Sequence, residues 1–218
     1  MIPNTNLQIG RDRFSRIVWE IMDEKLVVDE DNPHEKIESI IYNQNRMRVE
    51  ANYNTGSLAY NDAYDLYTII NYFKPRVVAE VGTFIGVSTH VIYEACKGEV
   101  DIHTCDFSND IKIVLPLINQ YPLTPSYVMF EKMRLKGITP DLVYLDGRLT
   151  KDDLREVSTE KYSDTVFVLD DFEGTEKGVA NALLLERSNT TLIYPRNVNK
   201  TAILIPYSRI EFVRQEMT

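Results

Sequence analysis

The sequence has 218 residues, of which 44% are hydrophobic and 26% charged, and its formal net charge is −9. This length and composition are typical of one soluble globular domain with an additional element and a sizeable core. The negative charge argues against a nucleic-acid backbone as substrate, because contacts to phosphates need a basic surface. Since no apolar run reaches the length of a membrane span, we also expect no membrane partner.

A cytoplasmic location is expected from two features of the chain. Cys96 and Cys105 are its only cysteines, which fits reduced thiols better than a disulfide framework. The N-terminus lacks the basic region and apolar run of a signal peptide.

Two helices are predicted before the first strand. Apolar residues recur at helical spacing over residues 11–28 and again over residues 35–50. We expect residues 1–53 to form a helical cap that covers the core domain, lines a substrate entrance or forms a face for a homo-oligomer. Packing helices without any such role are an equally good interpretation.

A polar turn follows at residues 54–57 and includes Thr55 and Ser57. Apolar residues between 64 and 73 then predict a helix that Pro75 ends. The turn could lie over a ligand, or Ser57 could simply cap the helix.

Residues 76–89, with the sequence RVVAEVGTFIGVST, predict a strand, a glycine turn and the first turn of a helix. Gly82 and Gly86 bracket a turn where a ligand can approach the backbone. Ser88 and Thr89 follow at the start of the helix, where unpaired N–H groups attract an anion. The stretch is therefore a candidate binding site for a nucleotide-like ligand.

The glycine spacing excludes two common nucleotide motifs. Phe84 and Val87 stand where the dinucleotide fingerprint G-x-G-x-x-G needs its second and third glycines, and the Gly-Lys-Ser/Thr of a P-loop is absent. The remaining pattern, acidic-x-Gly-x-x-x-Gly, starts at Glu80. It resembles the first motif of the class I S-adenosylmethionine-dependent methyltransferases, although an ordinary strand-to-helix turn is the alternative.

The rest of the chain alternates between predicted strands and helices. A strand at 100–107 ends near Asp106, whose carboxylate is well placed to bind ribose hydroxyls, and Phe107 could pack on the adenine face. The later elements are a helix at 110–120, a short strand at 126–130, a loop or short helix at 131–138, a strand at 142–145, a helix at 151–161, a strand from 165, a helix at 176–187 and a hairpin at 190–195 and 200–208.

This order predicts an α/β fold with a doubly wound, mostly parallel sheet. The final hairpin resembles the antiparallel seventh strand of the Rossmann-like methyltransferase fold. We therefore expect a seven-stranded sheet with an antiparallel C-terminal strand and a cofactor-binding domain over residues 54–218.

Three carboxylates are predicted at one edge of this sheet. Asp146, Asp170 and Asp171 follow neighbouring strands, and ligands of open α/β sheets bind along the edge where strands end. Such carboxylates repel one another unless they are protonated or bound to a cation. A divalent ion such as Mg²⁺, Ca²⁺ or Mn²⁺ prefers these oxygen ligands, although Asp170 and Asp171 could instead cap the next helix.

The pattern over roughly residues 54–208 is similar to the metal-dependent catechol, caffeoyl-CoA and macrolide-sugar O-methyltransferases. The resemblance implies a metal held by Asp146, Asp170 and Asp171. It places Glu80 and Ser88 near the methionine end of the cofactor and Arg148 near its adenine. The full set of implied cofactor contacts is Thr55, Ser57, Glu80, Gly82, Thr83, Gly86, Ser88, Asp106, Phe107 and Arg148.

One position departs from the family pattern. The catechol enzymes have a lysine general base three residues after the fourth-strand aspartate, where this chain has Leu149, and no histidine stands nearby. Lys151 lies two residues further on and is the catalytic candidate besides Asp146, although a solvated lysine at a helix start is the simpler interpretation.

These patterns together predict a methyltransferase that uses S-adenosylmethionine and a divalent cation to methylate a hydroxyl of a small-molecule acceptor. A metal-free small-molecule methyltransferase and a non-catalytic S-adenosylmethionine-binding protein are the alternatives. The helices before residue 54 and the segment 108–125 are expected to shape the acceptor pocket, whose ligand the sequence does not identify.

Overall fold

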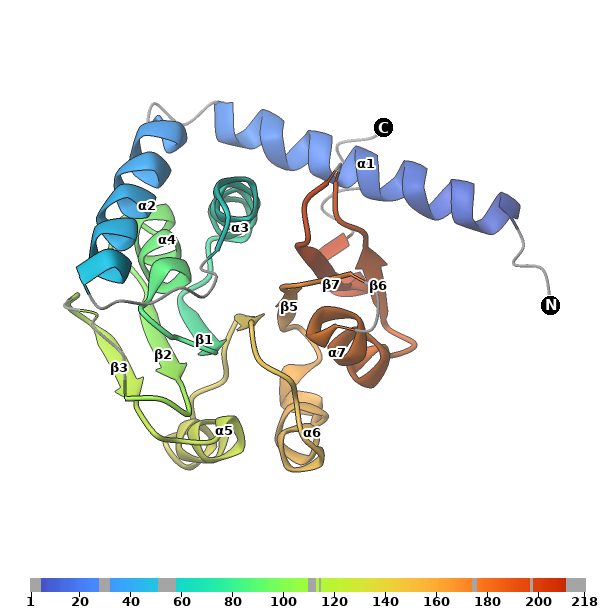
Figure 1. Ribbon diagram of the computed structural model, residues 1–218. Helices are drawn as coiled ribbons and strands as arrows, with labels where there is room; N and C mark the ends of the chain where they lie inside the picture. The colour runs from blue at the N-terminus through green and yellow to red at the C-terminus, as the bar shows by residue number, and fades with distance from the viewer. Residues whose placement is uncertain are drawn as a thin grey trace.

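Figure 1 shows the computed structural model, which describes residues 5–27, 32–50, 58–109, 113, 115–173, 176–196 and 198–210. One seven-stranded sheet has the order β3-β2-β1-β4-β5-β7-β6. Its strands are β1 (Val77–Val81), β2 (Asp101–Cys105), β3 (Ile118–Tyr121), β4 (Leu142–Leu145), β5 (Val166–Leu169), β6 (Thr190–Ile193) and β7 (Ala202–Pro206).

Strands β1 to β5 pair in parallel, whereas β7 runs antiparallel to its neighbours β5 and β6. The predicted seven-stranded, mostly parallel sheet with an antiparallel C-terminal strand is therefore confirmed. The central strands are nearly continuous apolar runs because helices cover both of their faces.

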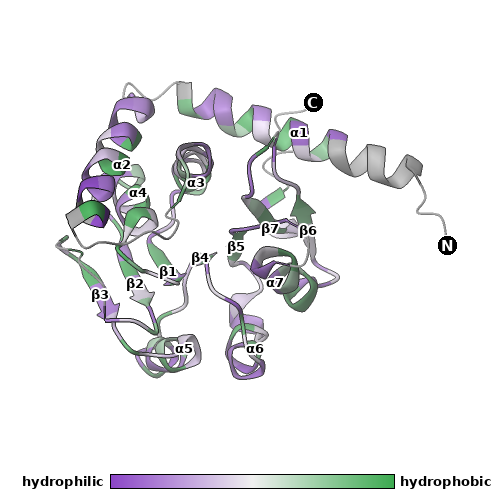
Figure 2. Ribbon diagram, viewed as in Figure 1, coloured by the Kyte–Doolittle hydropathy of each residue, from purple (hydrophilic) through white to green (hydrophobic). Residues whose placement is uncertain are grey.

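The helices lie in two layers. They are α1 (Thr5–Val27), α2 (Pro33–Glu50), α3 (Tyr60–Phe73), α4 (Val87–Ala95), α5 (Ser126–Leu135), α6 (Lys151–Val157) and α7 (Lys177–Leu185), with a short 3₁₀ helix at Glu160–Tyr162. Helices α1 to α4 share one buried apolar cluster with the sheet, and α5 to α7 share a second cluster on the other face. Figure 2 shows hydrophilic residues along the outward-facing α2 and α6.

The N-terminal helices α1 and α2 pack outside α3 and α4 (Figure 1). None of the helices in the described ranges combines the length and apolarity that crossing a bilayer would require.

Two sequence-based assignments in the middle of the chain are wrong. Residues 118–120 of the helix predicted at 110–120 belong instead to strand β3. This strand pairs only with β2 and is partly exposed, so it keeps polar residues and lacks the apolar run that would have predicted a strand. The strand predicted at 126–130 is the first half of α5. A short apolar run cannot distinguish the two structures, and here Pro125 precedes a helix that buries Met129 and Met133 one turn apart.

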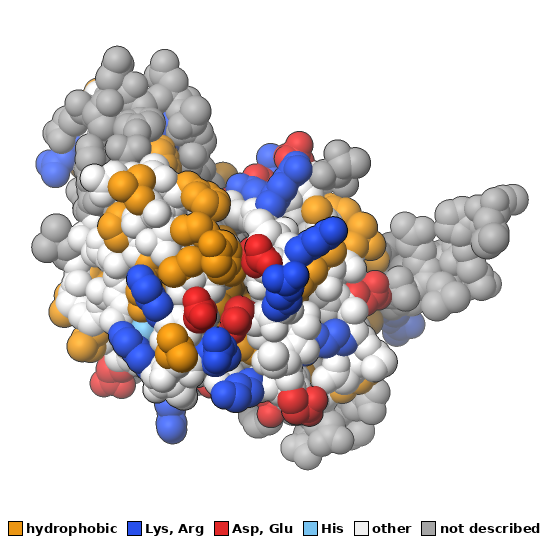
Figure 3. Space-filling view, turned by 90° about the horizontal axis from the view of Figure 1, so that it is seen from below, with side chains coloured by type: hydrophobic (Ala, Val, Ile, Leu, Met, Phe, Trp, Pro, Cys, Tyr) orange, Lys and Arg blue, Asp and Glu red, His pale blue; other side chains and the backbone are white. Residues whose placement is uncertain are grey.

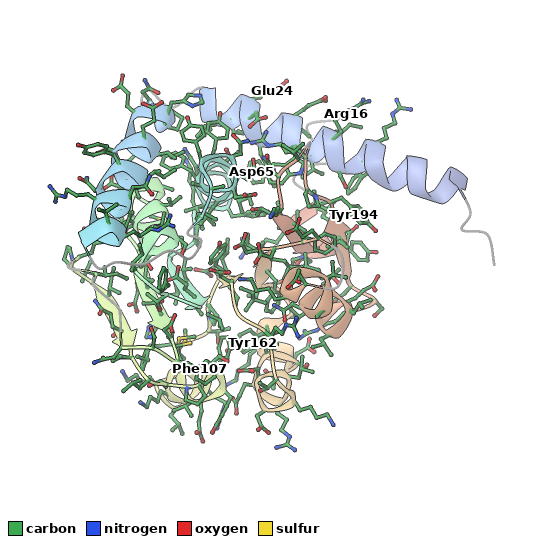
Figure 4. All side chains as sticks on the ribbon, in the orientation of Figure 1. Arg16, Glu24, Asp65, Phe107, Tyr162 and Tyr194 are labelled. Carbon is green, nitrogen blue, oxygen red and sulfur yellow. The ribbon has the colours of Figure 1, made fainter. Side chains whose placement is uncertain are left out.

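A partly buried ion-pair group joins α1, α3 and the loop between β6 and β7. Arg196 from that loop donates from Nε to Asp65 at 2.6 Å and also pairs with Asp23. Asn199 donates to the other oxygen of Asp65 at 2.6 Å, and the guanidinium lies 4.7 Å from the centroid of the Trp19 ring. Burial raises the pKa of the fully buried Asp65 to about 6, although Arg196 opposes this shift. Figure 4 labels Asp65 on α3, which faces this loop.

Arg196→Ala is expected to lower the free energy of unfolding by about 3 kcal/mol, because it leaves the buried Asp65 without its cation. The control is Arg16→Ala, which removes an exposed pair with Glu20 and should lower it by less than about 1 kcal/mol. Urea denaturation near neutral pH measures both values. Equal losses in the two variants would show that the buried group does not stabilise this junction.

Candidate functional site

A cavity of about 540 Å³ opens where β1, β2, β4 and β5 end. Its lining comes from residues 82–88, from the residues after β2, β4 and β5, and from the starts of α3 and α7. Figure 3 views the molecule from the side toward which the arrows of β2 and β3 point in Figure 1, and acidic and basic side chains lie beside one another near its centre. This size is typical of small-molecule sites, which span about 300–1,000 Å³.

The glycine turn after β1 needs both of its glycines. Gly82 has φ +94° and Gly86 has φ +86°, a region that favours glycine. A Cβ on Gly82 would lie 3.1 Å from the carbonyl carbon of Asp146, so the turn packs directly on the end of β4. Gly86 caps α4, and Val87 and Ser88 of its first turn line the cavity. The unpaired N–H groups of that turn can therefore meet an anionic group of a ligand.

Asp106, directly after β2, lines the same cavity. Its carboxylate accepts hydrogen bonds from the backbone N–H groups of Phe84 and Ser108, both at 2.7 Å. These bonds fix its orientation and leave further lone pairs for ribose hydroxyls. Phe107 is 72% exposed and does not line the cavity, and the adenine contact expected for it stays a prediction (Figure 4).

Glu80 lies beneath the glycine turn and does not line the cavity. Its carboxylate accepts hydrogen bonds from the hydroxyls of Thr89, at 2.6 Å, and Thr104, and it also interacts with Ser88. Burial raises the pKa of Glu80 to about 7. Thr83, which lines the cavity, contacts Thr104. In this arrangement Glu80 ties the start of α4 to β2, and the cofactor contact expected for it stays a prediction.

Asp146, Asp170 and Asp171, which we name the acidic cluster, come together as expected. The register that pairs Leu145 with Leu169 places the ends of β4 and β5 side by side, and one carboxylate oxygen of each aspartate lies within 4.8 Å of the others. Burial and the neighbouring carboxylates raise the pKa of Asp170 well above its ordinary range. The group is therefore a concentration of negative charge that needs protons or a cation.

Lys177, the first residue of α7, supplies a cation that the sequence analysis missed. Its ammonium donates to Asp146 Oδ1 and lies 3.0 Å from Asp171 Oδ2. Burial alone would lower the pKa of Lys177, but these two carboxylates outweigh that effect and raise it. The absence of a lysine at position 149 was the one signal that could have prompted a search for it elsewhere.

The remaining candidates lie away from the acidic cluster or outside the described residues. Leu149 is a buried core residue whose N–H donates to Asn181. Lys151 is exposed at the start of α6, and Arg148 is exposed near Glu176, at 3.9 Å; neither lines the cavity. Thr55 and Ser57 lie outside the residues that the structure describes.

The acidic cluster has the donors of a site for a divalent cation, because three carboxylates converge from two strand ends. The ammonium of Lys177 lies between two of these donors. The residues therefore fit a divalent ion where that side chain moves aside.

Glu80→Gln is expected to change how stability depends on pH. The folded chain holds the Glu80 proton up to about pH 7, whereas an ordinary glutamate releases it near 4.5, so the free energy of unfolding falls as the pH rises between these values. This loss amounts to roughly 3 kcal/mol and should be absent from the variant. Urea denaturation at about pH 4.5 and about pH 8 measures it. If stability depended on pH identically in both proteins, the raised pKa of Glu80 would be contradicted.

No protein-family model matches the sequence, and no curated protein matches it either. Solved structures do match the fold. The O-methyltransferase TomG of Streptomyces achromogenes, involved in tomaymycin synthesis and in complex with SAM, has a TM-score of 0.57 at 17% identity, over 82% of this chain and 90% of that one. An O-methyltransferase of Bacillus cereus in complex with SAH has a TM-score of 0.56 at 12% identity, over 81% and 91%.

A methyltransferase of Podospora anserina, PaMTH1, bound to SAH, has a TM-score of 0.53 at 14% identity, over 81% of this chain and 88% of that one. At these identities the likeness concerns the fold. The chain thus has the Rossmann-like fold of the S-adenosylmethionine-dependent methyltransferases, as its first glycine motif and its C-terminal hairpin predicted.

Proposed function

We propose that the chain is an S-adenosylmethionine-dependent methyltransferase that methylates a hydroxyl of a small molecule. The observation that carries the proposal is that a single cavity joins the glycine turn and Asp106 to the acidic cluster. The first half has the backbone and the carboxylate that a nucleoside with a methionine tail needs, and the second half has charges that can act on an acceptor hydroxyl. TomG and the Bacillus cereus enzyme, which share the fold, are O-methyltransferases.

The cofactor half of the cavity would bind and orient the methyl donor. Asp106 would accept hydrogen bonds from the ribose hydroxyls, and the first turn of α4 at Ser88 would hold the carboxylate of the methionine end. When bound, the cofactor supplies a sulfonium methyl group for in-line displacement. The backbone of the turn at Gly82, which touches the end of β4 at Asp146, would direct that methyl toward the acidic cluster.

The acidic half would position the acceptor. We propose that Asp146, Asp170 and Asp171 hold a divalent cation such as Mg²⁺, whose charge lowers the pKa of the acceptor hydroxyl. Two adjacent oxygens, as in a catechol or another vicinal diol, suit three carboxylates that converge on one point. Asp146 lies closest to the glycine turn and would set the direction of the acceptor oxygen relative to the methyl donor.

A metal-free methyltransferase is the second candidate, and one specific observation favours it. The ammonium of Lys177 already contacts Asp146 and Asp171, so the chain has a cation of its own at this edge. Methyl transfer that survives a chelator would support this candidate. Binding of the cofactor without turnover over a broad panel of acceptors would instead support a non-catalytic S-adenosylmethionine-binding protein.

Calorimetric titration with S-adenosylhomocysteine tests the cofactor class. We expect micromolar binding, roughly −8 kcal/mol, both with Mg²⁺ and with EDTA. Asp106→Asn should weaken it about tenfold, because the variant loses a charged acceptor for the ribose hydroxyls. Asp152→Asn, which changes an exposed aspartate on α6, is the matched control and should bind like the wild type. No binding by the wild type in either buffer would remove the proposed function.

Asp170→Asn separates cofactor binding from catalysis. The variant should bind S-adenosylhomocysteine like the wild type but transfer methyl groups at least roughly 100-fold more slowly, because the acceptor site loses a charged ligand. Release of S-adenosylhomocysteine over a panel of catechols and vicinal diols measures the reaction, with Asp152→Asn as control. Full activity of Asp170→Asn in a chelator would exclude a metal-binding role of the acidic cluster.

A further inference from the structure

The ammonium of Lys177 contacts carboxylate oxygens of Asp146 and Asp171, which are also donors that a divalent ion would use. We propose that Lys177 is the resident cation of this site and that it and a divalent ion exclude each other, so that a metal binds only as the lysine side chain leaves. This inference rests on the proposed function, because it assumes that the acidic cluster is a site where a cation acts. It adds a device that regulates metal occupancy, built from a residue outside the metal ligands.

The contacts of Lys177 show that its ammonium and a metal ion would compete for two of the carboxylate oxygens. The ammonium hydrogen-bonds Asp146 Oδ1 and lies 3.0 Å from Asp171 Oδ2. An ion bound to these two oxygens would lie about 2.1 Å from each for Mg²⁺ and about 2.4 Å for Ca²⁺. It would then be in contact with the ammonium nitrogen, where two positive charges repel strongly. An ion that binds these two oxygens therefore requires the ammonium to move away.

The backbone of α7 holds Lys177 beside the acidic cluster. A Cβ on the next residue, Gly178, would lie 2.4 Å from the carbonyl oxygen of Asp170 and 2.8 Å from the backbone nitrogen of Phe172, so the helix starts in direct contact with the turn after β5. One turn later, the Asn181 side chain donates to the Gly147 carbonyl oxygen at 2.8 Å. The start of α7 is thus attached to the segments that follow both β5 and β4.

Because the backbone of α7 is held in place, a metal ion can replace the ammonium only if the Lys177 side chain changes its conformation. It is 24% exposed, which gives its long aliphatic stem a route to solvent while the helix stays in place. Lys200, the other lysine that lines the cavity, pairs with Glu173 at 2.8 Å. Among the described residues, Lys177 is the lysine that pairs directly with two members of the acidic cluster, whereas Lys200 pairs with Glu173 and interacts with Asp171 at longer range.

Binding of Mn²⁺, followed by electron paramagnetic resonance, tests the exclusion in three proteins. Lys177→Met should bind Mn²⁺ about tenfold more tightly than the wild type, or tighter still, because the ion no longer displaces an ammonium. Lys161→Met, which changes an exposed lysine outside the cavity, is the matched control and should bind like the wild type. Equal affinities of Lys177→Met and wild type would overturn the proposal, and so would the absence of binding to all three.

A second measurement uses the wild type and does not depend on how the variant folds. Amine acetylation, read by mass spectrometry, should modify Lys177 faster at saturating Mn²⁺ than in EDTA, while the exposed Lys161 reacts at one rate in both. An unchanged rate at Lys177 would overturn the exclusion. Titration of the same samples with S-adenosylhomocysteine tests the proposed function separately from the competition between Lys177 and the metal. Absence of S-adenosylhomocysteine binding would remove the proposed function, but it would not change the result on the competition.

Discussion

The structure depends on a concentration of negative charge at the ends of β4 and β5. Parallel pairing of these strands forces Asp146 and Asp170 to lie side by side, and the chain turns so that Asp171 joins them. Burying carboxylates together is unfavourable unless protons or cations balance them. The raised pKa of Asp170 and the ammonium of Lys177 are two responses to this one constraint.

The same topology brings the two halves of the cavity together. Strand β1 carries the glycine turn and lies between β2, which ends at Asp106, and β4, which ends at Asp146. Gly82 approaches the backbone of Asp146 so closely that any side chain would crowd it. A ligand that follows the turn from Asp106 thus arrives at the acidic cluster without crossing another element. This adjacency, more than any single residue type, supports the proposed methyl transfer.

The sequence predicted β4 and β5 well, because each is a continuous apolar run that an aspartate follows directly. It failed at β3 and at the start of α5 for the same physical reason. The edge strand Ile118–Tyr121 meets one neighbour and keeps polar residues, whereas residues 126–130 form an apolar run that packs as a helix. The spacing of apolar residues indicates which side chains are buried. Over four or five residues, this spacing does not distinguish a helix from a strand.

Residues at strand ends were placed well, since the ends of parallel strands meet wherever the sheet forms. Positions further from a strand end cannot be predicted in this way, because they depend on how the next loop or helix packs. Asp171 lines the cavity, whereas Phe107, which lies equally far past its own strand, does not, and neither does Lys151. Lys177 is the converse case. It stands six residues after Asp171, and contacts around Gly178 bring its ammonium to Asp146. The catechol enzymes have a lysine three residues after the matching aspartate, where Leu149 stands here. The charge that this edge requires is therefore supplied from a different helix, which a motif defined by spacing cannot detect.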